Sequence, residues 1–265
     1  GSHGSSRANP HGRGPRATPS SARPAFVSDL NPEQQDAVLQ TDGPLLILAG
    51  AGSGKTRVIT YRIAHLVGGG HAEPDEVLAV TFTNKAAEEM RDRVARLLAT
   101  DCSRMWISTF HALCARLLRR EGPAIGLSRD FVIYDATDQL SAVKQIEKEL
   151  NIDDKLVPPR IALARISQAK NRMEGPDSLV GTWNIRDEQI GRIYARYVDV
   201  LAESNALDFD DLLLKVVELF DRAEHVRTRY ARRFRYVMVD EYQDTNRPQY
   251  LLIRHLASEH RNLAV

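Results

Sequence analysis

A short glycine-rich stretch, AGAGSGKT at residues 49–56, combines the residue types that hold a polyphosphate. Glycines lack a Cβ, so their backbone N–H groups can turn inward around an anion, and a helix that follows points its positive end at the phosphates. We expect the Lys55 ammonium to neutralise the β and γ phosphates and the Thr56 hydroxyl to bind Mg²⁺. The strict pattern begins with glycine, so Ala49 is a tolerated variation. The predicted nucleotide-binding residues of the loop are Ala49, Gly50, Ala51, Gly52, Ser53, Gly54, Lys55 and Thr56.

A second chemical signal is the acidic pair in VMVDEYQDTN, where Asp240 directly follows an apolar run. Ligand sites of α/β proteins lie at the carboxyl ends of such strands. We therefore expect Asp240 to hold the Mg²⁺ shell through water and Glu241 to polarise the attacking water as a general base. The alternatives are an ordinary acidic loop and a two-metal nuclease, and no further cluster of acids or histidines supports the latter.

Four short apolar runs end in small or polar residues, which is typical of strands buried on both faces of a parallel sheet. The runs are LLILA (45–49), VLAVTF (77–82), MWIST (105–109) and YVMVD (236–240). Helical patterns follow the first three, at 55–67, 84–99 and 110–121. This alternation predicts an α/β fold with a parallel sheet flanked by helices.

The alternation stops between about residues 124 and 205, where helical patterns dominate and Asp135 is a plausible N-cap. We therefore expect the α/β domain to occupy 27–123 and 206–265, with a mostly helical insertion at 124–205. Residues 1–26 hold almost nothing to bury, so we interpret them as a disordered tail that opens with GSH, a cloning remnant. A basic arm that touches nucleic-acid phosphates is the alternative.

Composition and charge exclude several classes of protein. No run approaches the roughly 18 apolar residues of a membrane span, and no secretion signal opens the chain. Cys102 and Cys114 have no metal-ligand spacing and form no disulfide framework, which favours a reducing cytoplasm. Four of the 36 basic residues lie in the tail, which leaves 32 against 35 acidic residues in the remainder. Nucleic acid would therefore have to bind at local basic or polar patches.

Six motifs in a fixed order carry a family resemblance. They are LNPEQ (30–34), AGAGSGKTR (49–57), TFTNKAAEEM (81–90), STFHALCARLLR (108–119), LDFDDLL (207–213) and DEYQDTN (240–246). From Leu30 to Val265 the chain resembles the N-terminal half of a superfamily 1A DNA helicase of the UvrD/PcrA/Rep type. The resemblance implies a P-loop NTPase fold with a RecA-like lobe, and ATP-driven movement along single-stranded DNA in the 3′ to 5′ direction.

The resemblance also assigns roles to residues around the nucleotide. Gln34 is similar to a glutamine that reads adenine, although a plain polar position on a helix surface is the alternative. Arg57 is similar to an arginine near the bound nucleotide. Gln243 is similar to a glutamine that senses the γ-phosphate and couples it to DNA.

Two turns are similar to the family's single-stranded DNA contacts, because aromatic faces stack on bases while hydroxyl and amide groups meet phosphates. The contact residues implied are Phe82, Thr83, Asn84, Thr109, Phe110 and His111. Phe82 and Phe110 taken alone are more typical of a core, and His111 could be a hydrogen-bonded structural histidine. In the insertion, ISQAKNRM (166–173) is similar to a segment that grips duplex DNA, so Lys170 and Asn171 are candidates, with a solvated helix end as the alternative.

The acidic motif LDFDDLL has a structural interpretation that we favour over direct chemistry. Asp208 is well placed as an N-cap, and Asp210 and Asp211 complement the dipole of the helix that follows.

The expected function is the ATP-binding and single-stranded-DNA-binding part of a 3′–5′ DNA helicase that acts in repair or replication. The implied cofactors and partners are ATP, Mg²⁺, single-stranded DNA, single-strand/duplex junctions and a second RecA-like lobe of the same full-length chain, with no membrane partner and a monomeric state. The chain ends at RNLAV, before the family's sensor motif and second lobe, so we expect it to unwind nothing alone. The alternatives are a fragment of a RecB-like helicase–nuclease and an ATP-gated DNA-binding or partner-docking module; a nucleoside kinase would not carry the other five motifs.

Overall fold

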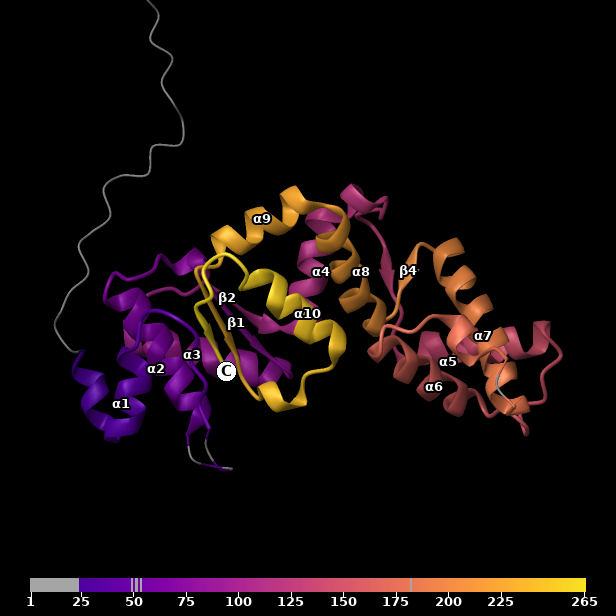
Figure 1. Cartoon of the computed structure of the whole chain (residues 1–265), viewed down its shortest axis with the longest axis horizontal. Coiled ribbons are helices and arrows are strands. Elements are labelled where there is room, and N and C mark those ends of the chain that lie inside the picture. Colours follow the sequence, from indigo (N-terminus) through magenta and orange to yellow (C-terminus); the bar gives the residue numbers. More distant parts are fainter. Residues whose placement is uncertain (1–23, 49, 51, 53, 182) are drawn as a thin grey trace, which may run out of the picture.

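A parallel sheet of four strands forms the centre of the larger part of the chain (Figure 1). The strand order is β2–β1–β5–β6, and every neighbouring pair is parallel. The strands are β1 (Val77–Thr81), β2 (Trp106–Thr109), β5 (Tyr236–Val239) and β6 (Leu263–Ala264). The computed structural model describes residues 24–48, 50, 52, 54–181 and 183–265, so most of the predicted tail lies outside the described residues. The predicted α/β class is confirmed.

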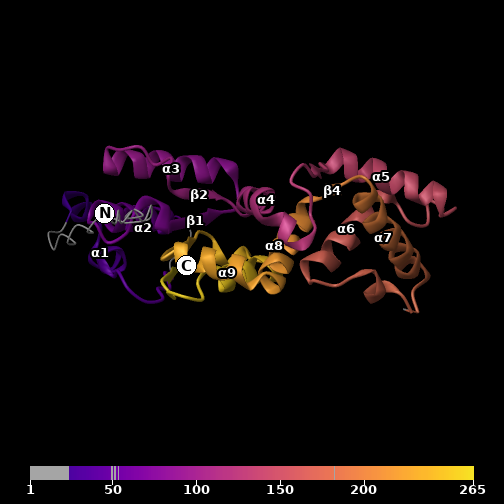
Figure 2. The ribbon, with the colours of Figure 1, turned by 90° about the horizontal axis from the view of Figure 1, so that it is seen from above.

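Helices cover both faces of the sheet, because alternate side chains of each strand point to opposite faces. Leu78 and Val237 face a core shared with α4, α8, α9 and α10, whereas Ala79 and Met238 face a core shared with α2 and α3. Figure 2 shows α3 and α9 on opposite sides of the strands. The helices are α2 (Lys55–Gly68), α3 (Asn84–Leu98), α4 (Phe110–Glu121), α8 (Phe209–Arg222), α9 (Glu224–Arg233) and α10 (Arg247–Leu256).

The first predicted strand, 45–49, differs from the expectation of burial on both faces. Leu45 N donates to Leu263 O (2.8 Å) and Ile47 N donates to Val265 O (2.7 Å), so the segment pairs with the end of the sheet next to β6. Leu45 and Ile47 pack on the core beneath α2, but Leu46 is 63% and Leu48 is 84% exposed. The prediction was wrong on this point, because a segment at the edge of the sheet has one uncovered face.

The segment after residue 124 forms a separate helical layer with a core of its own. Its helices are α5 (Ala136–Glu149), α6 (Pro159–Asn171) and α7 (Ile185–Glu203), and Asp135 caps α5 as predicted. Val143, Ile166 and Tyr197 lie in this core. Figure 1 shows the layer at the opposite end of the molecule from α1. Two short parallel strands, β3 (Val132–Ile133) and β4 (Ala206–Leu207), join where the chain enters and leaves the layer.

The remaining elements are short. They are η1 (Ala25–Asp29), α1 (Pro32–Leu39), η2 (Pro74–Glu76), η3 (Gly122–Ile125), η4 (Pro176–Leu179) and η5 (Tyr242–Asp244). Among the described residues, no helix is both long and apolar enough to cross a membrane.

Helix α2 is buried along most of its length, including the polar side chains of Thr60, Arg62 and His65. Arg62 is 1% exposed and donates to the carbonyl oxygens of Ala37 and Gln40. His65 is 5% exposed, and burial lowers its pKa to about 4, with His71 and Arg62 adding to the shift. The folded chain therefore keeps His65 neutral at pH values where an unfolded chain would protonate it.

Because neutral His65 is buried, we predict that the protein loses stability in acid. Between its unfolded pKa of about 6.5 and its folded value, only the unfolded state gains the proton, so stability is lost as the pH falls. We expect acidification from pH 6.5 to 4.5 to lower the free energy of unfolding of the parent chain by about 2 kcal/mol more than that of His65→Gln. Urea unfolding at several pH values measures this, with the exposed His225→Gln as the control. Identical pH profiles of parent and His65→Gln would contradict it.

Candidate functional site

The glycine-rich loop leads directly into the first turn of α2. Gly54 has a left-handed backbone (φ 90°), as does Gly52 (φ 74°), which glycine adopts without steric cost. The N-cap of α2 is Gly54, which has no side chain to accept the first N–H groups of the helix. Ala49, Ala51 and Ser53, which were also predicted to bind the nucleotide, lie outside the described residues.

The hydroxyl of Thr56 meets the carboxylate of Asp240, although 184 positions separate them in the sequence. Thr56 Oγ1 donates to Asp240 Oδ2 at 2.9 Å, which joins the start of α2 to the end of β5. Asp240 is 6% exposed, and burial raises its pKa, although the Thr56 hydroxyl opposes the shift. A hydroxyl and a carboxylate are hard oxygen donors, the kind that Mg²⁺ prefers. The two residues predicted to bind Mg²⁺ therefore fit that ion.

Lys55, Glu241 and Gln243 form a second row of contacts beside Thr56 and Asp240. Lys55 Nζ lies 3.9 Å from Glu241 Oε2, and the Gln243 amide donates to the same oxygen. Glu241 has a left-handed backbone (φ 52°), which is uncommon outside glycine, and its N–H donates to Asp240 Oδ1. Such strain at a single residue is typical of functional sites. All four predicted catalytic residues thus lie together.

Two hollows flank Lys55. One, of about 390 Å³, is lined by α1 residues including Gln34 and by Leu45–Leu48. The other, of about 310 Å³, is lined by Asp240, Glu241 and Gln243 together with the same edge segment. The two hollows share Leu46, Ile47, Leu48 and Lys55 in their lining, so they lie next to each other on either side of Lys55. Among the described residues, no group of three or more His, Cys, Asp or Glu side chains could hold a metal, so a two-metal nuclease gains no support.

Gln34 lines the hollow beside α1 and also takes part in the cap of that helix. Its backbone N–H donates to Asn31 Oδ1 and its Oε1 accepts from Asn31 N, which completes a capping box at the start of α1. Its Nε2 lies next to Gly54, so a Cβ added at Gly54 would be 3.3 Å from it. Arg57, predicted near the nucleotide, donates to Asp29 O (3.2 Å) and to the Tyr61 hydroxyl (3.3 Å).

The two turns predicted to bind DNA lie side by side, because β1 and β2 are parallel neighbours with Thr81 opposite Thr109. Thr83 Oγ1 accepts from Ala86 N and caps α3, and Thr109 Oγ1 accepts from Ala112 N and caps α4. Both hydroxyls therefore already bind backbone. Asn84 in the first turn is exposed.

The aromatic residues of these turns differ in exposure. The rings of Phe82 and Phe110 lie 5.3 Å apart, but Phe110 is 1% exposed and belongs to the core beneath α4 and α8. A buried ring cannot stack on a base, so the contact predicted for Phe110 is corrected to a core role. Phe82 is half-buried, and His111 is half-buried with its ring edge-on to Phe209 at 5.8 Å. Burial lowers the pKa of His111, and Asp210 opposes the shift.

Lys170 contradicts the prediction that it reaches DNA phosphates. Its side chain is 2% exposed, and Nζ donates to Asp208 Oδ2 (2.7 Å) and Asp211 Oδ1 (2.8 Å). Its position directly after Ala169 and four residues after Ile166, both buried, was the signal that this face of α6 packs inward. Asp208 caps α8 as predicted, in a capping box with Asp211.

Asn171 lies at the same junction. Its Oδ1 accepts from Asn246 Nδ2 at 2.6 Å, and Asn246 caps α10. Asn246 was not among the predicted site residues, although an asparagine two residues before Pro248 is a recognisable helix start.

Comparison with known proteins agrees with this geometry. The sequence profile of the family described as the UvrD/REP helicase N-terminal domain matches residues 30–265. The ATP-dependent DNA helicase PcrA of Bacillus subtilis (strain 168) is 50% identical over 241 residues, which are 91% of this chain and 33% of that protein. The ATP-dependent DNA helicase PcrA of Staphylococcus aureus (strain Mu50) is 46% identical over 242 residues, with the same coverage of 91% and 33%. The chain thus spans about a third of the length of these relatives. It belongs to the UvrD/REP helicase family and matches that family's N-terminal domain.

Proposed function

We propose that this chain is the ATP-binding and single-stranded-DNA-binding part of an ATP-dependent 3′–5′ DNA helicase. The observation that carries the proposal is the contact of Thr56 with Asp240 beside the pair of Lys55 and Glu241. It brings a phosphate-binding lysine, two oxygen donors for a metal and a candidate base into one site from two distant segments. The names of the relatives support ATP as the nucleotide and DNA as the substrate.

Each residue of the site has its own proposed role in ATP hydrolysis. The Lys55 ammonium and the uncapped N–H groups of α2 bind the phosphates. Thr56 and Asp240 would hold Mg²⁺, which neutralises charge on the β and γ phosphates when it is bound. Glu241 accepts a proton from the water whose oxygen attacks the γ-phosphorus, and ADP leaves.

Gln34 and Gln243 are proposed to recognise the base and to sense the γ-phosphate, respectively. Gln34, in the hollow beside α1, is suited to read the adenine edge, since an amide both donates and accepts hydrogen bonds. Gln243 binds Glu241 directly, so a change at the γ-phosphate can reach the segment that leads to α10.

Single-stranded DNA is proposed to cross the carboxyl edge of the sheet. Phe82, Asn84 and His111 offer an aromatic face, an amide and an imidazole there, and the neighbouring Thr83 and Thr109 shape the turns. Asn171 is the residue of the insertion that remains a candidate for DNA contact.

The activity of the whole protein is part of the proposal. Because the chain spans about a third of its relatives, we propose that a second RecA-like lobe of the full-length protein completes the ATP site and the DNA groove. Opening and closing of two lobes around the nucleotide would turn its differential affinity into movement. We propose a monomeric, cytoplasmic enzyme of DNA repair or replication that acts at single-strand/duplex junctions.

Nucleotide binding should depend on Lys55. Its removal leaves phosphate charge uncompensated, so Lys55→Ala should weaken Mg-ATP binding by about 2–5 kcal/mol. Titration calorimetry measures the affinity, and Lys85→Ala, which removes an equally charged but exposed side chain, is the matched control. An affinity of Lys55→Ala within about twofold of the parent chain would contradict the assignment of Lys55 as a phosphate-binding residue.

Glu241 should separate binding from chemistry in the full-length protein. Glu241→Gln keeps the size of the side chain and loses the base, so ATP should still bind while DNA-stimulated turnover falls by roughly 10²–10⁴. Glu89→Gln on the exposed face of α3 is the control. Turnover that survives in Glu241→Gln would mean that another group accepts the proton.

DNA binding by this chain should be weak, independent of sequence and sensitive to salt. Few phosphates can be neutralised at the turns around Asn84 and His111, so the log–log salt slope should be shallow, roughly −0.7 per contact for single strands. Fluorescence anisotropy at several salt concentrations, with duplex competitors, measures this. Strong preference for one duplex sequence would favour a sequence-reading module instead.

A further inference from the structure

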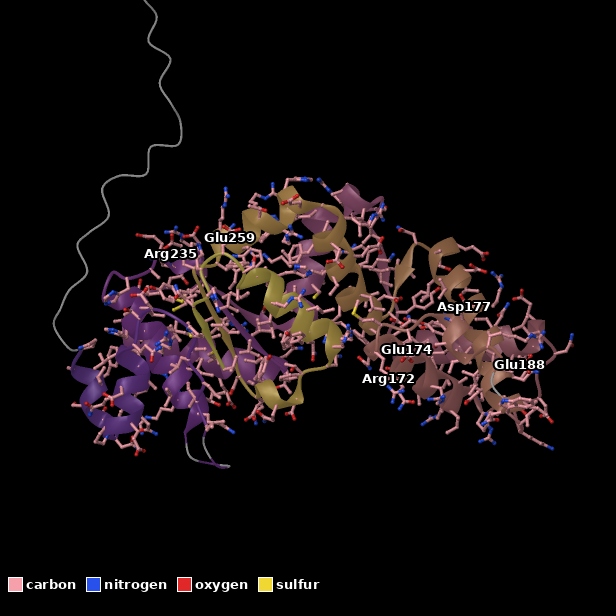
Figure 3. The ribbon with its side chains drawn as sticks, in the orientation of Figure 1. Arg172, Glu174, Asp177, Glu188, Arg235 and Glu259 are labelled. Carbon is pink, nitrogen blue, oxygen red and sulfur yellow. The ribbon has the colours of Figure 1, made fainter. Side chains whose placement is uncertain are left out.

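The last turns of α6 carry three polar side chains that all contact the larger part of the chain. Ser167, Lys170 and Asn171 lie on one helical face, because their spacing of three and four residues matches the turn of an α-helix. Lys170 bonds Asp208 and Asp211, Asn171 bonds Asn246, and the Ser167 hydroxyl opposes the rise in the pKa of Asp210 that burial causes. Figure 3 labels Arg172 and Glu174, which follow these residues, at the end of the insertion that faces the sheet domain.

Both carboxylates that pair with Lys170 accept further hydrogen bonds. Asp208 Oδ2 accepts from Lys170 Nζ and from the Tyr197 hydroxyl (3.1 Å), while Asp208 Oδ1 accepts from Asp211 N. Asp211 Oδ1 accepts from Lys170 and its Oδ2 accepts from Asp208 N. Burial alone would lower the pKa of Lys170, but Asp211 and Asp208 raise it, so the ammonium stays charged. Two carboxylates therefore fix one buried cation from two directions.

The turn that Lys170 holds is also the neighbour of a proposed DNA contact. Phe209, between the capping residue Asp208 and Asp210, lies edge-on to His111 at 5.8 Å. Asp210 is close enough to act electrostatically on His111. The first turn of α8 is thus held by the insertion on one side and packs against the His111 turn on the other.

A second contact, between Asn171 and Asn246, connects α6 to the segment near the candidate nucleotide site. Asn246, the partner of Asn171, caps α10 by accepting from Gln249 N at 3.0 Å. It lies five residues after Glu241 in the chain. Adjacent residues of α6 therefore bind both the DNA-proximal turn and the segment that follows the catalytic acids.

We propose that Lys170 is a positioning residue that fixes the helical insertion against the first turn of α8, and that single-stranded DNA affinity at the His111 turn depends on it. The Lys170 side chain is 2% exposed, so it acts through its partners Asp208 and Asp211 and through the neighbouring Phe209 and Asp210. The DNA part of this inference rests on the proposed function, whereas the fixing of the His111 turn does not.

The test compares Lys170→Met with Lys215→Met in this chain. Lys215 lies on α8 in a half-buried ion pair with Glu218, so the control removes the same charge without touching the junction. We expect Lys170→Met to weaken single-stranded DNA binding about tenfold, within the range of residues that transmit coupling without ligand contact, and to leave Mg-ATP affinity within about twofold. DNA affinity of Lys170→Met equal to that of Lys215→Met would overturn the proposal.

A triple variant guards against simple misfolding. Lys170→Met with Asp208→Asn and Asp211→Asn removes the cation together with both buried carboxylates, and asparagine still caps a helix. We expect this variant to fold with a thermal midpoint near that of the parent chain, yet to keep the loss in DNA affinity. Parental DNA affinity in the triple variant would show that Lys170 only balances buried charge.

Hydrogen exchange without any ligand separates this inference from the proposed function. In the triple variant, exchange should accelerate at residues 110–112 and at Arg247 and Gln249, and stay unchanged in β1 and α2. Uniform acceleration, or none at 110–112, would overturn the positioning role. If the parent chain bound no DNA, the proposed function would fail, and the exchange result would still decide whether Lys170 fixes the turn.

Discussion

Parallel pairing of β1 with β2 and with β5 decides where the candidate residues of the sheet domain lie. Thr81 is opposite Thr109, and Val80 is opposite Val239, so three strands end at the same edge. Each strand then continues into a turn that carries polar or aromatic side chains. The carboxyl edge of a parallel sheet is where α/β proteins bind their ligands, and the register here brings nucleotide chemistry and proposed DNA contacts to neighbouring turns.

Most of these turns also begin a helix. Thr83, Thr109, Asp208 and Asn246 each accept a backbone N–H at the start of the next helix. A cap of this kind contributes about 1 kcal/mol to stability, so each of these turns is stabilised by its own side chain. Helix α2 differs, since its N-cap is Gly54, which has no side chain to cap it, and the first N–H groups of this helix are the ones proposed to bind phosphate.

Local sequence patterns predicted the fold class and named the residues that meet at the candidate nucleotide site. Glycines before Lys55 and an acid after an apolar run need no knowledge of distant contacts, and the cap at Asp208 follows from residue type and position. The contact of Thr56 with Asp240 confirmed that the two segments meet.

The errors share a physical cause, which is that burial depends on partners far away in the sequence. Lys170 is buried because Asp208 and Asp211, 38 and 41 residues later, neutralise it. Phe110 is in the core because helix α8 covers it, and Leu48 is exposed because the edge segment has one uncovered face. The family resemblance assigned contacts by position and could not say which side of a turn each side chain takes.

The closeness of Gly54 to Gln34 has a consequence for tolerance to mutation. A Cβ at position 54 would lie 3.3 Å from the Gln34 amide nitrogen, and the backbone there is left-handed. Any larger residue would be opposed twice, by its own backbone and by the glutamine proposed to read the base. A substitution at position 54 would therefore disturb both the proposed phosphate loop and the glutamine proposed to read the base, because the two residues are neighbours.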